Sequence, residues 1–245
     1  MRSLFVISLP RSLSSVVYQA ARTALKLAEP GWVSDGEILN NDRYVTCGDS
    51  LQQKGRKFTR PRREQRVAAR LYAFLDQIVQ RDDFAYKDVV QPFVISEWLQ
   101  RNGAGLAVLR IRRPLADVAS SMLDRGWLYP AKGPLGPHNE NAATALLRGL
   151  LDAQIALDAV PAVDVDYDAL IRDESALRDA LRVLAPDQEI EEPRYVSAGF
   201  CEYRKNRLER RGEKRYQILT SRLEELQAET DSLTTVAPEA PAIAE

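Results

Sequence analysis

The first candidate for chemistry is a loop that follows a short apolar run near the amino terminus. Leu4–Ser8 has the composition of a buried strand, and Ser14–Lys26 carries apolar residues at helical spacing. Four hydrogen-bond donors lie in the loop between the two segments and in the first residues of the expected helix: Arg11, Ser12, Ser14 and Ser15. A helix amino terminus adds free N–H groups and a positive dipole end, so we expect an anion of the phosphate type to bind here. For this loop alone, a serine-rich helix cap with a surface arginine is an equally good interpretation.

A second segment of the same kind follows the clearest buried strand in the sequence, Leu106–Ile111. Arg112 comes directly after this strand, and Ser120 stands eight residues further on. A proline ends the strand and a helix begins beside it, so the serine and the arginine can face the same anion. Ser121 could substitute for Ser120. The structural alternative is an arginine at the sheet edge that pairs with Asp117.

Both segments resemble the nucleotide motifs of the PAPS-dependent sulfotransferases. Leu9-Pro-Arg-Ser-Leu-Ser-Ser15 resembles their 5′-phosphosulfate loop, usually Pro-Arg/Lys-Ser-Gly-Thr-Thr. Arg-x-Pro, with a serine eight residues after the arginine, resembles their 3′-phosphate motif, and the two motifs stand in the family's order. The sequence departs from the family at two positions. Leu13 replaces a glycine, where leucine resists a left-handed backbone, and Asp117 stands one place later than the usual aspartate.

The resemblance implies a co-substrate and the residues that bind it. The co-substrate is 3′-phosphoadenosine 5′-phosphosulfate (PAPS), with no metal. The loop residues implied for its 5′ side are Arg11, Ser12, Leu13, Ser14 and Ser15. Arg112 and Ser120 are implied for the 3′-phosphate. Many members also carry a basic loop over this phosphate near the position of Tyr203–Arg207, which adds Arg204 and Lys205, although a charged run in a helix is usually a solvated face.

The same resemblance implies the catalytic residues. Many members use a histidine before the 3′-phosphate motif, but the single histidine here, His138, follows it. A branch similar to the tyrosylprotein and bacterial small-molecule enzymes uses a glutamate in a Gly-Glu segment, which implies Glu37 as the general base. Lys87 lies in a segment that resembles the Lys-Asp-Pro element of that branch, and with Arg11 it would neutralise the transferring group. A helix-start glutamate and a surface lysine paired with an aspartate are the structural alternatives.

The elements that must position these residues alternate between strands and helices. Strands are expected at Leu4–Ser8, Trp32-Val33, Phe84–Val89, Leu106–Ile111 and Val163–Tyr167. Helices are expected at Ser14–Lys26, from the basic stretch 54–70 to about Gln80, and at Val94–Asn102, Leu115–Asp124, Asn141–Ala159, Ser175–Leu184 and Glu202–Gln227. This alternation predicts an α/β fold with a mostly parallel sheet flanked by helices. We expect one domain over residues 1–230 and a disordered tail over 231–245.

Composition excludes several other classes of protein. The 245 residues carry 34 basic and 35 acidic side chains, so there is no global cationic field for nucleic acid or membranes. Two cysteines and one histidine are too few for a Cys/His zinc site and argue against a disulfide framework. No apolar run approaches the ~18 residues of a membrane span, and no signal peptide is recognised, so a cytoplasmic protein is expected.

The sequence therefore predicts a P-loop-type sulfotransferase that moves a sulfuryl group from PAPS to a hydroxyl or amine of a small-molecule or peptide acceptor. Gly126–Pro137 is interpreted as a flap or as a wall of the acceptor site. The basic stretch Lys54–Arg63 binds an anionic acceptor, covers the active site or is a flexible surface loop. One alternative is a P-loop phosphotransferase, which the absence of a Walker motif disfavours. The other is a non-catalytic module that binds a partner through the charged C-terminal helix, with Leu13 as its best support.

Overall fold

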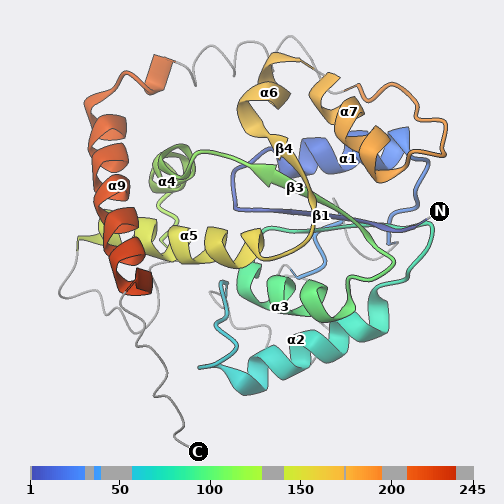
Figure 1. The fold of residues 1–245 in the computed structure, drawn as a ribbon, viewed down its shortest axis with the longest axis horizontal. Coiled ribbons are helices and arrows are strands. Elements are labelled where there is room, and N and C mark those ends of the chain that lie inside the picture. Colours follow the sequence, from blue (N-terminus) through green and yellow to red (C-terminus); the bar gives the residue numbers. More distant parts are fainter. Residues whose placement is uncertain are drawn as a thin grey trace, which may run out of the picture.

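The computed structural model describes residues 2–30, 36–39, 57–128, 141–173, 175–194 and 209–235. Within them a four-stranded sheet, with every strand parallel, has the order β2-β1-β3-β4 (Figure 1). The strands are β1 (Leu4–Ser8), β2 (Ala85–Asp88), β3 (Ala107–Arg112) and β4 (Val163–Asp166). The predicted α/β class with a parallel sheet is confirmed.

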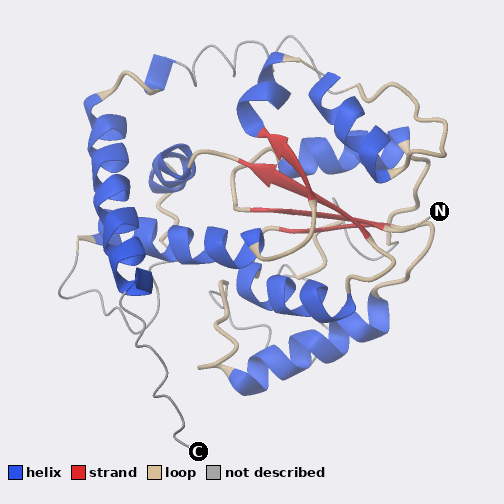
Figure 2. Ribbon diagram, in the orientation of Figure 1, coloured by secondary structure: helices blue, strands red, loops and turns tan. Residues whose placement is uncertain are grey.

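Helices cover both faces of this sheet (Figure 2). On one face lie α1 (Ser14–Ala24), α6 (Tyr167–Arg172) and α7 (Ser175–Leu184). On the other lie α2 (Gln65–Ile78), α3 (Pro92–Asn102) and α5 (Ala142–Asp158), while α4 (Leu115–Leu123) and α9 (Lys214–Thr235) pack beyond the carboxyl ends of the strands. Parallel strands buried on both faces read as continuous apolar runs, as the fully buried β1 does.

Side chains of β1 alternate between two apolar clusters because successive residues of a strand point to opposite faces. Phe5 and Ile7 join the cluster formed with α2, α3 and α5. Leu4 and Val6 join the cluster formed with α1 and α7. We refer below to the α5 side and the α1 side of the sheet.

The connections place β1 at the point where the chain changes direction across the sheet. From β1 the chain reaches β2 on one side of it, and the next strand, β3, lies on its other side. In open parallel sheets, ligands bind outside the carboxyl ends of strands at such a point, because the loops there diverge. The loops after β1 and β3, which carry the two predicted anion motifs, both leave the sheet at this place.

Several predicted element boundaries differ from the structure. Within the basic stretch, residues 61–63 form a turn, and α2 begins only at Gln65. The last helix begins at Lys214 and continues to Thr235, so the first five residues of the expected disordered tail are helical. The strand expected at Trp32-Val33 lies outside the described residues. In the described part of the chain, no helix is both long and apolar enough to cross a membrane.

Candidate active site

The loop after β1 is held in an unusual backbone conformation. Arg11 and Leu13 both have positive φ, 65° and 60°, in the left-handed region that L residues with a side chain rarely occupy. Leu13 thus adopts the conformation for which its family counterpart is a glycine. Leu13 is also the N-cap of α1, and no side chain of the described residues caps it. The first N–H groups of α1 are therefore left for another acceptor.

The loop lines a cavity of about 350 Å³ together with four segments that are distant in the sequence. Residues 10–16 form one wall, Glu37 and Lys87 another, and Lys57 and Trp127 a third. Every residue predicted for the 5′ side and for catalysis lines this cavity: Arg11, Ser12, Leu13, Ser14, Ser15, Glu37 and Lys87. Tertiary structure thus brings together residues that are far apart in the chain, such as Arg11, Lys87 and Trp127.

Lys87 reaches the amino terminus of α1 from the neighbouring strand. Its side chain is 1% exposed, and Nζ donates a hydrogen bond to the Ser15 Oγ at 2.7 Å. Lys87 pairs with Val6 in the register of β1 and β2, so its side chain points to the α1 side. The lysine predicted from the sequence is therefore buried beside the loop and does not lie on the surface.

Glu37 is placed next to Lys87 by backbone pairing. Lys87 N donates to Gly36 O at 2.7 Å, and Ile38 N donates to Lys87 O at 3.2 Å, so residues 36–38 run along the edge of β2. Gly36 has φ +62°, and a Cβ there would lie 2.2 Å from the ring of Tyr18. Both the backbone and the close approach of Tyr18 require glycine. Glycine at position 36 therefore has a structural role, because it allows the backbone turn that presents Glu37 to the cavity.

Asp88, next to Lys87, is a buried carboxyl group. Its Oδ1 accepts hydrogen bonds from Gln91 N at 2.8 Å and Val90 N at 3.2 Å, while its buried Oδ2 has no partner among the described residues. Burial raises the pKa of Asp88 to about 8; the Gln91 hydrogen bond opposes this shift, and repulsion from Glu37 adds to it. The group is therefore largely protonated at neutral pH, unlike an exposed aspartate.

On the other side of the loop, the segment after β3 contacts it directly. Arg113 Nη1 donates to the Arg11 carbonyl oxygen, and Arg11 Nε donates to Ser121 Oγ at 3.2 Å. The Arg113 guanidinium also lies over the Tyr167 ring, 4.4 Å from its centroid, and its Nε is 4.0 Å from Asp117 Oδ2. Asp117 and Ser121 are four residues apart in α4, so they share one helical face.

Arg112 and Ser120, which are predicted to face one anion, do not contact the first loop in the structure. Arg112 turns to the α5 side, where Nε donates to Asp164 Oδ2 at 2.7 Å and Nη2 lies 2.9 Å from Asp158 Oδ1. Both Ser120 and Ser121 are buried in α4, and Ser121 is the serine that contacts the loop. The residues that meet the first loop are therefore Arg113 and Ser121, one position later than predicted.

Strand geometry explains this shift of one residue. Ala107, Leu109 and Ile111 pack on the α1 side, so Arg112 faces the α5 side with Arg110, and the chain returns to the α1 side at the next position. The sequence contains an indication of this shift. Asp117 stands one place later than the family's aspartate when counted from Arg112, but it has the family's spacing when counted from Arg113.

The arginines on the α5 side change the pKa of their partner Asp164. Burial tends to raise this pKa, but hydrogen bonds from Arg110 and Arg112 outweigh burial and hold it below its ordinary value.

A further arginine near the site was not predicted. Arg211, just before α9, donates to Asp117, with Nε to Oδ2 at 3.2 Å, and its Nη2 lies 2.6 Å from Asp168 Oδ1. These hydrogen bonds from Arg211 lower the pKa of Asp168 despite its partial burial. Arg204 and Lys205, predicted to contact the 3′-phosphate, lie outside the described residues.

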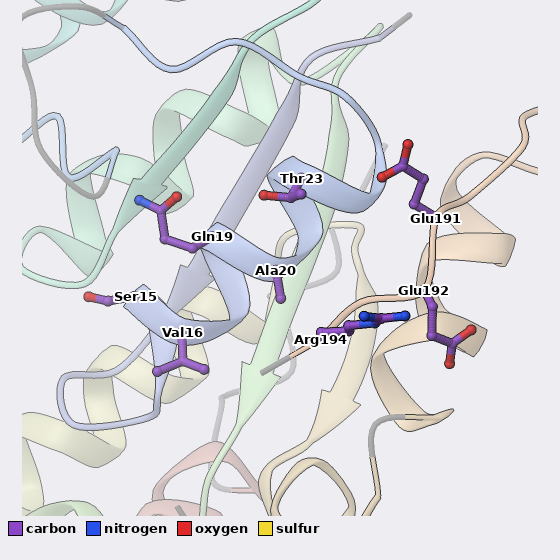
Figure 3. Close-up of a pocket in the computed structure, with 8 residues that line it drawn as sticks. All are labelled: Ser15, Val16, Gln19, Ala20, Thr23, Glu191, Glu192 and Arg194. Carbon is purple, nitrogen blue, oxygen red and sulfur yellow. The ribbon is translucent and has the colours of Figure 1, made fainter. Parts of the chain in front are cut away.

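Figure 3 shows a second cavity, of about 840 Å³, between α1 and the segment that follows α7. Its lining consists of Ser15, Val16, Gln19, Ala20 and Thr23 from α1, and Glu191, Glu192 and Arg194 from that segment. Both carboxylates are paired, Glu191 with Lys26 at 3.1 Å and Glu192 with Arg178 at 3.0 Å. Ser15 and Val16 line both cavities, so a ligand bound at the loop has room to continue along α1.

Comparisons with known proteins give similar structures but no sequence relative. No family model matches the chain, and no curated protein matches it. A similar solved structure is the sulfotransferase domain from the curacin biosynthetic pathway, with a TM-score of 0.44, 12% identity, and coverage of 90% of this chain and 96% of that one. Another is a sulfotransferase from Alicyclobacillus acidocaldarius, with a TM-score of 0.41, 13% identity, and coverage of 92% and 95%. Both TM-scores lie below 0.5, so this likeness by itself decides neither family nor function.

Proposed function

We propose that this protein is a sulfotransferase that uses PAPS and transfers its sulfuryl group to an acceptor. One observation carries the proposal: the loop after β1 shares a cavity with Lys87 and Glu37 and, on its other side, contacts Arg113 and Ser121. A nucleotide with a phosphosulfate and a separate 3′-phosphate needs two adjacent anion sites of this kind. Transfer of its sulfuryl group needs cations and a base beside one of them.

The residues present fit the 5′ side of such a nucleotide. Ser12 is 1% exposed and lines the cavity, and its Oγ has no hydrogen-bond partner among the described residues, so it is a donor awaiting an acceptor. The uncapped amino terminus of α1 and Arg11 add further donors. Together these groups would hold the phosphosulfate, while Arg113 and Ser121 would bind or position the 3′-phosphate.

The proposed transfer is a single in-line displacement. PAPS supplies the activated sulfuryl group. The acceptor oxygen forms a bond to sulfur while the bond from sulfur to the bridging phosphate oxygen breaks, which releases 3′,5′-ADP. Glu37 takes the proton of the acceptor hydroxyl, and Lys87 and Arg11 stabilise the negative charge that develops on the leaving oxygen. The hydrogen bond from Lys87 to Ser15 already holds the ammonium at the amino terminus of α1.

Calorimetry with two nucleotides tests this proposal. We expect 3′,5′-ADP to bind without added metal and ADP to bind much more weakly, because only a sulfotransferase-type site has use for a 3′-phosphate. Transfer from labelled PAPS to an acceptor extract would then show the activity. Equal affinity for the two nucleotides would instead indicate a phosphotransferase or a module that has kept only the fold.

A further inference from the structure

We propose that the outer face of α2 docks an acidic amphipathic helix of a partner protein, through a set of arginines that we call the arginine stripe. The stripe consists of four exposed residues: Arg62, Arg63, Arg66 and Arg70. They end the basic stretch of the sequence and continue it along α2, which lies beyond α3 at the edge of the molecule (Figure 1). None of the four lines the cavity at the loop after β1, so this surface is separate from the candidate active site.

The fold uses one arginine of the basic stretch internally and leaves the stripe on the surface. Arg60 Nη2 donates to Asp152 Oδ2 at 2.9 Å. The guanidinium groups of the stripe, by contrast, make no hydrogen bond or ion pair with the residues that the structure describes. Two carboxylates beside the stripe have other partners. Glu64 Oε2 accepts from Arg60 N at 3.1 Å, and Glu97 Oε2 accepts from the Tyr72 hydroxyl at 2.8 Å.

Several exposed arginines in other parts of the described surface are paired with carboxylates. Arg182 Nη1 lies 3.5 Å from Asp179 Oδ1. Arg210 and Arg215 both pair with Asp124, at 2.6 Å and 2.9 Å. The stripe therefore differs from these surfaces, because it gathers four positive charges without the carboxylates that would balance them.

The positions of these charges disfavour the helix that carries them. Arg66 and Arg70 are four residues apart on α2, a spacing at which like charges repel each other. Arg66 is also the second residue of the helix, where the positive end of the dipole disfavours a cation, and the first turn of α2 contains no acidic residue. A partner with negative charges would remove both penalties, which gives this pattern a physical reason.

An apolar groove beside the stripe points to a protein helix as the partner. This groove, of about 560 Å³, lies between α2 and α3, and its lining includes Arg62, Arg101, Pro61, Ala68, Ala69 and Tyr72. Protein interfaces are rich in arginine and tyrosine and poor in lysine. A helix docked here would place an apolar side chain in the groove. Its carboxylates, four residues apart and about 6 Å from each other, would pair bidentately with Arg66 and Arg70.

Nucleic acid and anionic membranes fit this surface less well. The net charge of the chain is −1, so no wide cationic field surrounds the stripe to attract a long polyanion. The stripe is also confined to the first turns of one helix and the turn before it. A short acidic segment of a protein matches this extent.

Binding of a designed peptide to the full chain tests the inference. The probe is a fluorescein-labelled helical peptide of about 18 residues, with glutamates at i, i+4 and i+8 and leucines on the adjoining face. A second peptide has the same composition, but its glutamates are distributed around the helix. Fluorescence anisotropy should show that the first peptide binds more tightly than the second. Added salt should weaken its binding, because the contacts are ion pairs at the surface.

Substitutions in the stripe should weaken this binding without harming the fold. The double variant Arg66→Gln/Arg70→Gln should bind the first peptide about tenfold more weakly, through the loss of two exposed ion pairs. Arg182→Gln is the matched control on α7, where the arginine side chain is 64% exposed, and should leave the affinity unchanged. In thermal unfolding, the double variant should unfold at the same temperature as the wild type or at a higher one, because repulsion within α2 is relieved.

Three results would overturn the inference. Equal binding of the two peptides, including no binding of either, or an unchanged affinity in the double variant would exclude the docking surface. Tighter binding of a single-stranded DNA of about 12 nucleotides or of phosphatidylglycerol vesicles, lost in the same double variant, would exclude a protein as the partner. A lower unfolding temperature of the double variant would show that the stripe stabilises α2, which removes the reason for a partner.

Discussion

On the β2 side of the loop after β1, the buried Asp88 carboxyl group forms no ion pair with the residues that the structure describes, whereas on the β3 side Asp168 is hydrogen-bonded to Arg211. Burial raises the pKa of Asp88 to about 8, and the hydrogen bonds from Arg211 hold the pKa of Asp168 below its ordinary value. The β3 side is thus a network of fixed charges in which Arg113, Asp117 and Arg211 also take part.

This difference matches two separate tasks of a transferase site, which are to hold a phosphate and to carry out the chemistry. Fixed and mutually neutralised charges keep their geometry over a wide pH range and suit a surface that holds a phosphate. The β2 side instead places a carboxylate, Glu37, next to a buried lysine, Lys87, in the cavity, which suits a base and a cation at a reacting centre. Substitutions on the two sides should therefore change different quantities.

The largest effect is expected at Glu37 on the β2 side. Glu37→Gln removes the proposed base and should lower turnover roughly 100- to 10,000-fold while leaving the affinity for 3′,5′-ADP unchanged. Both quantities are measured on the same sample, with Glu189→Gln, an exposed glutamate, as the control. Near-normal turnover would show that Glu37 lines the cavity without acting as the base.

The next effect separates two neighbouring arginines on the β3 side. Arg113→Ala should weaken 3′,5′-ADP binding by about 2 to 4 kcal/mol, because a charge-assisted contact or its support is lost. Arg112→Ala is the matched control and should change the affinity little, because Arg112 pairs with Asp158 and Asp164 on the α5 side. Calorimetry measures both, and thermal unfolding checks that Arg113→Ala is folded. A larger loss in Arg112→Ala would restore the pairing predicted from the sequence.

The third effect concerns stability and pH on the β2 side. Because its pKa is raised to about 8 in the folded protein, Asp88 binds a proton between about pH 4 and 8 that the unfolded chain has released. Its contribution to stability is fully present below about pH 4 and is lost progressively as the pH rises from about 4 to about 8. Asp88→Asn lacks this dependence. As the pH rises, the free energy of unfolding of Asp88→Asn should increase relative to that of the wild type by up to about 1.4 kcal/mol per pH unit. Urea unfolding at pH 5.5 and 7.5 measures this, and parallel changes in the two proteins would contradict a neutral Asp88.

The smallest effect concerns the loop between the two sides. Leu13→Gly and Leu13→Ala remove nearly the same apolar contacts, but only glycine adopts φ 60° without strain. The glycine variant should therefore be more stable than the alanine variant by about 1 kcal/mol, after allowance for the greater backbone entropy of glycine in the unfolded state. Thermal unfolding of the pair measures the difference. Equal stability, or a more stable alanine variant, would argue against a left-handed Leu13.

Sequence patterns were sufficient for the elements that are long or strongly apolar. The predicted strand at Leu4–Ser8 is confirmed with the same bounds, and the helix expected at Leu115–Asp124 is observed one residue shorter. The predicted start of α2 was wrong, because the positive charges of the basic stretch form no periodic pattern that marks a helix boundary. The roles of the site residues remain predictions, although the structure brings seven of them to one cavity.

The part of the site that could be predicted is the part whose geometry is local. A strand, a loop with donors and a helix amino terminus are contiguous in the chain, so residues 4–24 already specify where an anion can bind. The need for glycine at position 36, which precedes Glu37, is not local in this sense, because it comes from the Tyr18 ring as well as from the positive φ.

Only the tertiary structure decided which arginine meets that loop. Arg112 and Arg113 have the same chemistry and adjacent positions, and the choice between them depends on which face of β3 packs against α1, a fact set by contacts across the sheet. The same holds for Lys57, Trp127 and Arg211, whose segments reach the site from distant parts of the chain. Local sequence constrains backbone conformation over a few residues, whereas these meetings depend on how helices and loops pack over the sheet.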